Sequence, residues 1–147
     1  MSELIKNLKL HEGFSARIYR DSLGYETIGY GFKLDCLTRD ELLLNGGKVQ
    51  PMSKEVSEQI LILKIKKLRP EVFSALKWLE AKPLCVQECV LEMAYQMGLK
   101  KLLMFKNTLK FIELGEYQKA YENGLQSLWA KQTPTRARDI LGMLLKA

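Results

Sequence analysis

The chain has 147 residues, which suits one domain or two small lobes with a substantial core. Hydrophobic residues make up 47% and charged residues 27%, as in ordinary globular proteins, and no run of 18 apolar residues suggests a membrane span. The net charge of +6 favours a polyanionic partner, which is nucleic acid, an anionic membrane surface or the bacterial cell wall.

The first predicted element is an amphipathic helix, capped by Ser2 and ended by Gly13. Glu12 falls in its last turn, where the carbonyl ends of the helix disfavour a carboxylate. Residues 16–34 follow as short antiparallel strands with a turn at residues 22–24. Gly29 and Gly31 would weaken a strand interior, so they indicate a close approach by another backbone or a ligand.

Helices are predicted for most of the remaining chain. Thr38 to Glu41 form a capping box, residues 46–52 form a linker, and Ser53 caps a long helix. That helix is expected to end near Arg69, because Pro70 disfavours its continuation.

Two prolines mark helix starts further along. The most apolar helix is expected to begin after Pro83 and to end at Gly98. The last helix is expected to begin at Pro134, with Thr133 as its cap.

These elements predict an α+β fold in a single domain, residues 1–147. Residues 12–52 form a small sheet-containing lobe, a connecting helix spans 53–69, and residues 1–11 and 70–147 form the larger helical lobe. A cleft between the lobes is expected to bind an extended polymer.

Cysteine and histidine usage argues against two classes of site. The odd number of cysteines (Cys36, Cys85 and Cys89) does not suit a disulfide framework. Cys85 and Cys89, four apart in an apolar run, are interpreted as small buried side chains. His11 is the only histidine, so we expect no metal site and no cofactor.

Glu12, Asp21 and Thr27 form the pattern with the clearest chemistry. Two carboxylates in different surroundings serve glycoside hydrolysis, one as acid and the other as base or nucleophile. Burial would raise the pKa of Glu12 and keep the proton that a general acid donates. Asp21 is expected to stay ionised and to activate water held by the Thr27 hydroxyl. Spacing alone leaves open that they are ordinary surface, turn and strand residues.

Four separated motifs extend this pattern over nearly the whole chain. They are Glu12-Gly13 with Asp21 and Thr27-Ile28-Gly29-Tyr30-Gly31, then Tyr95-Gln96-Met97-Gly98, Phe105-Lys106-Asn107-Thr108-Leu109, and Trp129-Ala130-Lys131-Gln132-Thr133-Pro134-Thr135-Arg136-Ala137. In this order they resemble the motifs of the phage-type lysozymes, the glycoside hydrolase family that includes T-even phage lysozyme. Residues 33–52 match the family poorly, and Phe32 stands where the T-even member has a histidine.

The resemblance implies a lysozyme-like fold and a muramidase that cleaves the β-1,4 bond between N-acetylmuramic acid and N-acetylglucosamine in peptidoglycan, with inversion. It implies Glu12 as the acid, Asp21 as the base or an electrostatic partner, and Thr27 beside the attacking water. Inversion would set the two carboxyl groups roughly 6.5–9.5 Å apart. Arg136 matches an arginine that pairs with the catalytic glutamate. Substrate-contacting positions fall on Lys33, Tyr95, Gln96, Thr108 and Asn123.

The resemblance also implies partners and a location. We expect peptidoglycan as the partner, a monomer, no stable membrane insertion, and no nucleic acid, because the lysines are dispersed. With no signal peptide in the sequence, a phage enzyme made in the host cytoplasm would need a holin to reach peptidoglycan in the periplasm and lyse the host. Two alternatives are a lytic transglycosylase and a non-catalytic cell-wall-binding domain. Asp21 and Thr27 argue against the transglycosylase, whose reaction needs no positioned water.

Overall fold

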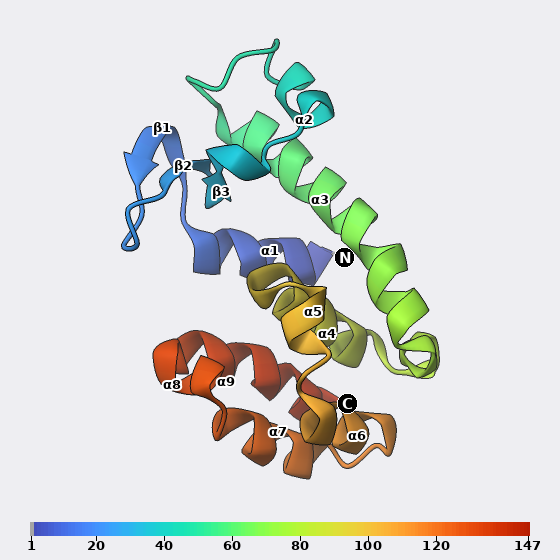
Figure 1. Cartoon of the computed structure of the whole chain (residues 1–147). Coiled ribbons are helices and arrows are strands. Elements are labelled where there is room, and N and C mark those ends of the chain that lie inside the picture. Colours follow the sequence, from blue (N-terminus) through green and yellow to red (C-terminus); the bar gives the residue numbers. More distant parts are fainter. Residues whose placement is uncertain (1) are drawn as a thin grey trace. The chain divides into compact units, whose positions relative to one another are not determined.

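The computed structural model describes residues 2–147, with side chains from residue 3 onward. The chain folds into two compact units, residues 2–66 and residues 67–147 (Figure 1). The predicted α+β class is confirmed, because one three-stranded antiparallel sheet accompanies many helices. In the part of the chain that is described, no helix is both long and apolar enough to cross a bilayer.

The first unit begins with α1 (Ser2–Glu12), whose Leu4 and Leu8 are fully buried. Gly13 follows with φ +70° and donates its N–H to the Lys9 carbonyl, so the predicted helix end is confirmed. The predicted cap, the Ser2 side chain, lies outside the described part of the structure.

The sheet follows α1 directly, with strand order β1-β2-β3. Its strands are β1 (Ser15–Arg20), β2 (Glu26–Gly29) and β3 (Phe32–Lys33). In the antiparallel register, Tyr19 faces Thr27 and Thr27 faces Lys33, while Ile28 faces Phe32. Ile28 and Phe32 are buried, so this pair forms the core-facing side of the small sheet.

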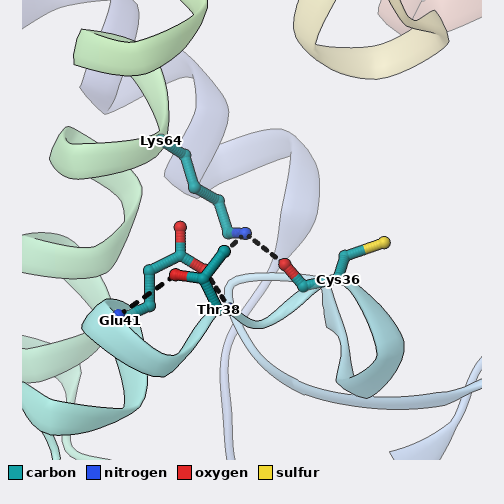
Figure 2. A network of polar contacts seen from close by, with 4 residues as sticks. All are labelled: Cys36, Thr38, Glu41 and Lys64. Carbon is teal, nitrogen blue, oxygen red and sulfur yellow. Dashed lines mark hydrogen bonds and ion pairs between the residues drawn. The ribbon is translucent and has the colours of Figure 1, made fainter.

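A polar network anchors the segment after the sheet, which contains the 3-10 helix η1 (Leu34–Cys36) and α2 (Arg39–Leu43). Both bonds of the predicted capping box between Thr38 and Glu41 are present. The Lys64 ammonium donates to the Glu41 carboxylate at 3.0 Å and to the Cys36 carbonyl at 3.2 Å (Figure 2). One lysine therefore joins α3 (Lys54–Ala75) to both short helices.

The predicted end of the long helix near Arg69 is wrong, because α3 continues through Pro70 to Ala75. Its predicted start is confirmed, since Ser53 Oγ accepts from the Val56 N–H. A proline inside a helix removes one backbone hydrogen bond and costs about 3 kcal/mol. Ile65 and Val72 on either side are fully buried, and burying two such side chains offsets a loss of that size. The boundary between the two units also lies within α3.

The second unit is built around α4 (Leu84–Met97), which follows the 3-10 helix η2 (Lys77–Ala81). The prediction of a mostly buried helix after Pro83 is confirmed, because every residue from Glu88 to Ala94 is buried. The sequence did not reveal that Glu88 and Glu92 belong to this buried stretch. Gly98, with φ +88°, ends the helix as predicted.

Short helices complete this unit. They are α5 (Leu99–Leu102), α6 (Lys106–Glu113), α7 (Tyr117–Leu125), α8 (Leu128–Gln132), α9 (Pro134–Gly142) and the 3-10 helix η3 (Met143–Lys146). Pro134 is the first residue of α9, as predicted, but the Thr133 side chain does not cap it. That hydroxyl instead donates to the Trp129 carbonyl, so it extends α8.

Candidate active site

The Glu12 carboxylate lies directly over Gly31. A Cβ atom built on Gly31 would come within 2.2 Å of Glu12 Oε2 and 3.1 Å of its Cδ. Gly31 also has φ +72°, a conformation that favours glycine. A close approach to this glycine therefore exists, but the group that approaches is the Glu12 side chain and not the backbone or ligand that was predicted.

Asp21 is held by the turn that joins β1 to β2. Its Oδ1 accepts two backbone hydrogen bonds, from Leu23 N and Tyr25 N, each 2.9 Å long. Its own N–H donates to the Tyr25 carbonyl at 2.9 Å. The Arg20 guanidinium donates to the Gly24 carbonyl instead of reaching Asp21. Two backbone amides therefore fix Asp21 Oδ1, and neither of these hydrogen bonds involves Oδ2.

Thr27 shares a backbone partner with Asp21. Its hydroxyl donates to the Tyr25 carbonyl at 2.9 Å, which is the same carbonyl that accepts from Asp21 N. Thr27 is only 2% exposed. Because the hydroxyl hydrogen is engaged, only its lone pairs are left to accept a hydrogen bond from water.

Lys33 lies at the end of β3, and its ammonium stands 4.4 Å from the centre of the Tyr25 ring. This cation–π contact and the backbone bonds above make Tyr25 the common support of Asp21, Thr27 and Lys33. The first unit therefore contains Glu12, Asp21, Thr27 and Lys33 on α1, the β1–β2 turn and the adjoining strands.

The second unit contains the other predicted contact residues, and two of them bond to each other. Thr108 Oγ1 donates to Asn123 Oδ1 at 2.6 Å, which joins α6 to α7. Both residues line a pocket of about 820 Å³. The remaining lining residues are Met97, Lys101, Met104, Phe105, Lys106, Asn107, Gln126, Ser127, Leu128, Trp129 and Gln132. This lining combines apolar and basic side chains with a few amides and hydroxyls.

Gln96 lies behind this pocket. Its Oε1 accepts from the Trp129 indole N–H at 3.0 Å, and its Nε2 lies 3.5 Å from Thr133 Oγ1. The Trp129 ring also meets Phe105 edge-on, with ring centroids 6.0 Å apart. Gln96 thus orients an aromatic wall of the pocket. Tyr95, at the end of α4, and Arg136, in the first turn of α9, are both half-buried.

The sequence matches the family model for phage lysozyme over residues 9–143. The chain belongs to the phage lysozyme family. It is 27% identical to the probable T4-type lysozyme 1 of Dictyostelium discoideum over 162 residues, which cover 98% of this chain and 94% of that protein.

A second relative is a phage structural protein. The chain is 27% identical to the pre-baseplate central spike protein Gp5 of Enterobacteria phage T4 over 154 residues, which cover 94% of this chain and 27% of that longer protein. Membership of the family makes the protein a glycosidase of the lysozyme type that acts on the bacterial cell wall.

Reasoning from the sequence did not single out two tyrosines of the first unit. Tyr25 supports Asp21 and Thr27 through its backbone, and a turn residue gives no sequence signal for that role. Tyr19 faces Thr27 across the sheet. Tyr19 precedes Asp21 by two positions, but β1 ends at Arg20 and Asp21 lies in the turn, so strand alternation gives no signal for Tyr19.

Proposed function

We propose that the protein hydrolyses the β-1,4 bond between N-acetylmuramic acid and N-acetylglucosamine in peptidoglycan, with inversion at the anomeric carbon. The observation that carries this proposal is the contrast between two carboxylates in one unit. Glu12 is seated over Gly31, whereas two amide donors fix one oxygen of Asp21 in a turn. A pair of carboxyl groups in unlike surroundings is what acid–base glycoside hydrolysis requires.

Glu12 is proposed as the general acid that protonates the oxygen of the leaving sugar. Its position supports this role, because Gly31 leaves room for the carboxyl group to lie on the backbone without a side chain beneath it. Arg136 is proposed as the cation that orients Glu12, and this rests on the resemblance of residues 129–137 to the family motif.

Asp21 is proposed as the base that activates water on the other face of the sugar. Its fixed Oδ1 would hold the carboxylate in one orientation, so that Oδ2 accepts the proton. Thr27 would accept a hydrogen bond from the same water, since its own hydrogen is already given to the Tyr25 carbonyl. Inversion requires the two carboxyl groups to be roughly 6.5–9.5 Å apart, which leaves space for the water.

Saccharide contacts are proposed for Lys33, Tyr95, Gln96, Thr108 and Asn123. The bond between Thr108 and Asn123 supports their role, because it orients the Asn123 amide at the wall of a pocket. Sugars present many hydroxyl groups, and fixed amides and hydroxyls beside an aromatic surface are suited to bind them.

The proposal is tested with purified peptidoglycan. Wild type is expected to release reducing ends, and Glu12→Gln is expected to lose at least about a hundredfold in rate, the usual effect of removing a general acid. Glu3→Gln, an exposed residue at the other end of the same helix, is the matched control and should keep the wild-type rate. Equal rates for Glu12→Gln and wild type would refute the role of Glu12.

The products separate hydrolysis from its alternatives. Newly formed ends should carry the α-anomer by NMR if the reaction inverts. Anhydromuramoyl ends, one water lighter by mass spectrometry, would make the protein a lytic transglycosylase. Binding to peptidoglycan with no release of ends would make it a cell-wall-binding domain.

We further propose that the activity serves lysis of a bacterial host as a monomeric endolysin released through a holin. The net charge of +6 supports attraction to an anionic cell wall, so binding to peptidoglycan should weaken as salt rises. Co-expression with a holin should cause lysis of the culture, and expression of either protein alone should not.

A further inference from the structure

Tyr19 lies in a row of side chains across the small sheet. In the antiparallel register, Tyr19 of β1 is directly opposite Thr27 of β2, and Thr27 is directly opposite Lys33 of β3. Residues directly opposite each other project their side chains on the same face of a sheet. Tyr19 therefore shares a face with a proposed water-holding residue and a proposed substrate contact.

The members of this row differ in how open they are. Thr27 is 2% exposed and its hydroxyl hydrogen is bonded to the Tyr25 carbonyl, whereas Tyr19 is 38% exposed. Asp21 follows Tyr19 by two positions along the chain and is fixed by the next turn. On β1, the strand that leads to Asp21, Tyr19 therefore presents a polar hydroxyl group that a ligand can reach.

The charges of both proposed catalytic carboxylates influence the pKa of the Tyr19 phenol. Partial burial raises the pKa of Tyr19 above its ordinary value of 10.0, and the negative charges of Glu12 and then Asp21 raise it further. Interactions between charges decay with distance and are screened by water and salt. The Tyr19 hydroxyl is therefore within electrostatic range of both carboxylates.

We infer that Tyr19 is a further catalytic residue of the proposed reaction, whose phenol O–H donates a hydrogen bond to the saccharide beside the bond that is cleaved. The inference rests on the proposed function, which assigns Glu12 and Asp21 to that bond. A phenol suits the position because it is a neutral donor. A lysine or arginine there would pair with the carboxylates and compete for them, whereas the phenol orients the sugar without adding a charge.

Steady-state kinetics on soluble peptidoglycan fragments test the inference. Tyr19→Phe keeps the ring and loses only the hydroxyl, so the midpoint of thermal unfolding should not change. Loss of one hydrogen bond that strengthens in the transition state should lower kcat/KM about tenfold, with the larger part in kcat. Tyr117→Phe, which removes the hydroxyl from a ring beside Lys82 in the second unit, is the matched control and should leave kcat/KM unchanged.

A titration tests the geometry separately from the activity. The ultraviolet absorbance change of Tyr19 is obtained by subtracting the curve of Tyr19→Phe from that of wild type. Glu12→Gln and Asp21→Asn should each lower the pKa of Tyr19, because each removes a negative charge that favours the protonated phenol.

Each outcome decides the inference. A wild-type kcat/KM for Tyr19→Phe, or a Tyr19 titration insensitive to both carboxamide variants, would overturn it while the loss of activity in Glu12→Gln still upheld the proposed function. No hydrolysis by wild type would overturn both. A fall in kcat/KM of Tyr19→Phe together with both downward shifts would establish the role of the hydroxyl.

Discussion

The Glu12 carboxylate occupies the space that a side chain on Gly31 would fill. A Cβ atom on Gly31 would lie 2.2 Å from Glu12 Oε2, well inside van der Waals contact. A side chain at position 31 and the carboxyl group of Glu12, the proposed catalytic acid, therefore cannot occupy their positions at the same time. Position 31 controls where the Glu12 carboxyl group can lie.

Gly31→Ala is expected to reduce activity by displacing Glu12, and to lower the free energy of unfolding by more than the roughly 1–2 kcal/mol of a left-handed backbone alone. Gly46→Ala isolates that backbone cost, because Gly46 has φ +65° and no described atom lies within 4 Å of its added Cβ. Activity assays and denaturant unfolding of both variants make the comparison. Equal stability losses with full activity in Gly31→Ala would contradict this conflict between position 31 and Glu12.

A buried ion pair fixes the segment after the sheet. The Glu41 side chain is 2% exposed and its Lys64 partner 17%, so removing the lysine leaves a buried carboxylate without its cation. Lys64→Met is expected to lower the free energy of unfolding by about 3 kcal/mol. Lys119→Met is the control, because Lys119 and Glu116 are exposed at 64% and 42%, and such a pair contributes about 0–1 kcal/mol. Equal decreases in the free energy of unfolding of the two variants would show that the Lys64–Glu41 pair stabilises the fold no more than an exposed pair does.

Local backbone chemistry predicted much of the fold. The Thr38 capping box, Gly13 at the end of α1 and Pro83 at the start of α4 depend on neighbours within four residues, and the structure confirms each. Pro70 shows the limit of such reasoning. Its local cost is overridden by burial of residues on both sides of α3, which depends on distant parts of the chain.

The candidate site shows the same division. The motif spacing singled out Glu12, Asp21 and Thr27 as candidates, and Gly31 was expected to allow a close approach by a backbone or a ligand. What approaches Gly31, and the role of Tyr25 as the shared backbone partner, depend on the register of β1 against β2. Spacing along a chain does not contain that register, so these relationships came only from the structure.

The three cysteines are expected to differ widely in reactivity. Cys36 is exposed and Cys89 is buried. Burial raises the pKa of the Cys89 thiol most, and the nearby Glu92 and Cys85 raise this pKa further. The raised pKa suppresses formation of the reactive thiolate. A disulfide reagent such as dithiobis-nitrobenzoate at pH 8 should modify Cys36 quickly and Cys89 only on unfolding. Cys36→Ser should remove the fast phase, and a fast phase that survives it would contradict this order.

The hydrogen bond from Thr108 to Asn123 links stability and substrate binding in the second unit. Thr108 is 2% exposed. Its hydroxyl donates to Asn123 Oδ1 at 2.6 Å and so orients the Asn123 amide at the pocket wall. Thr108→Val keeps the shape of the side chain and removes that donor. Stability should change by only about 1 kcal/mol, because half-buried Asn123 can turn its amide toward water.

Activity should respond more strongly, since the Asn123 amide would then lose the orientation proposed to bind the saccharide. We expect kcat/KM of Thr108→Val to fall about tenfold, while Thr135→Val, at an exposed threonine of α9, keeps the wild-type value. Asn123→Ala and the double variant complete a thermodynamic cycle. If Thr108 acts through Asn123, its substitution should have little further effect once the amide is gone, because the two residues then form one functional unit. Independent, multiplying losses would instead mean that each side chain contacts the sugar by itself.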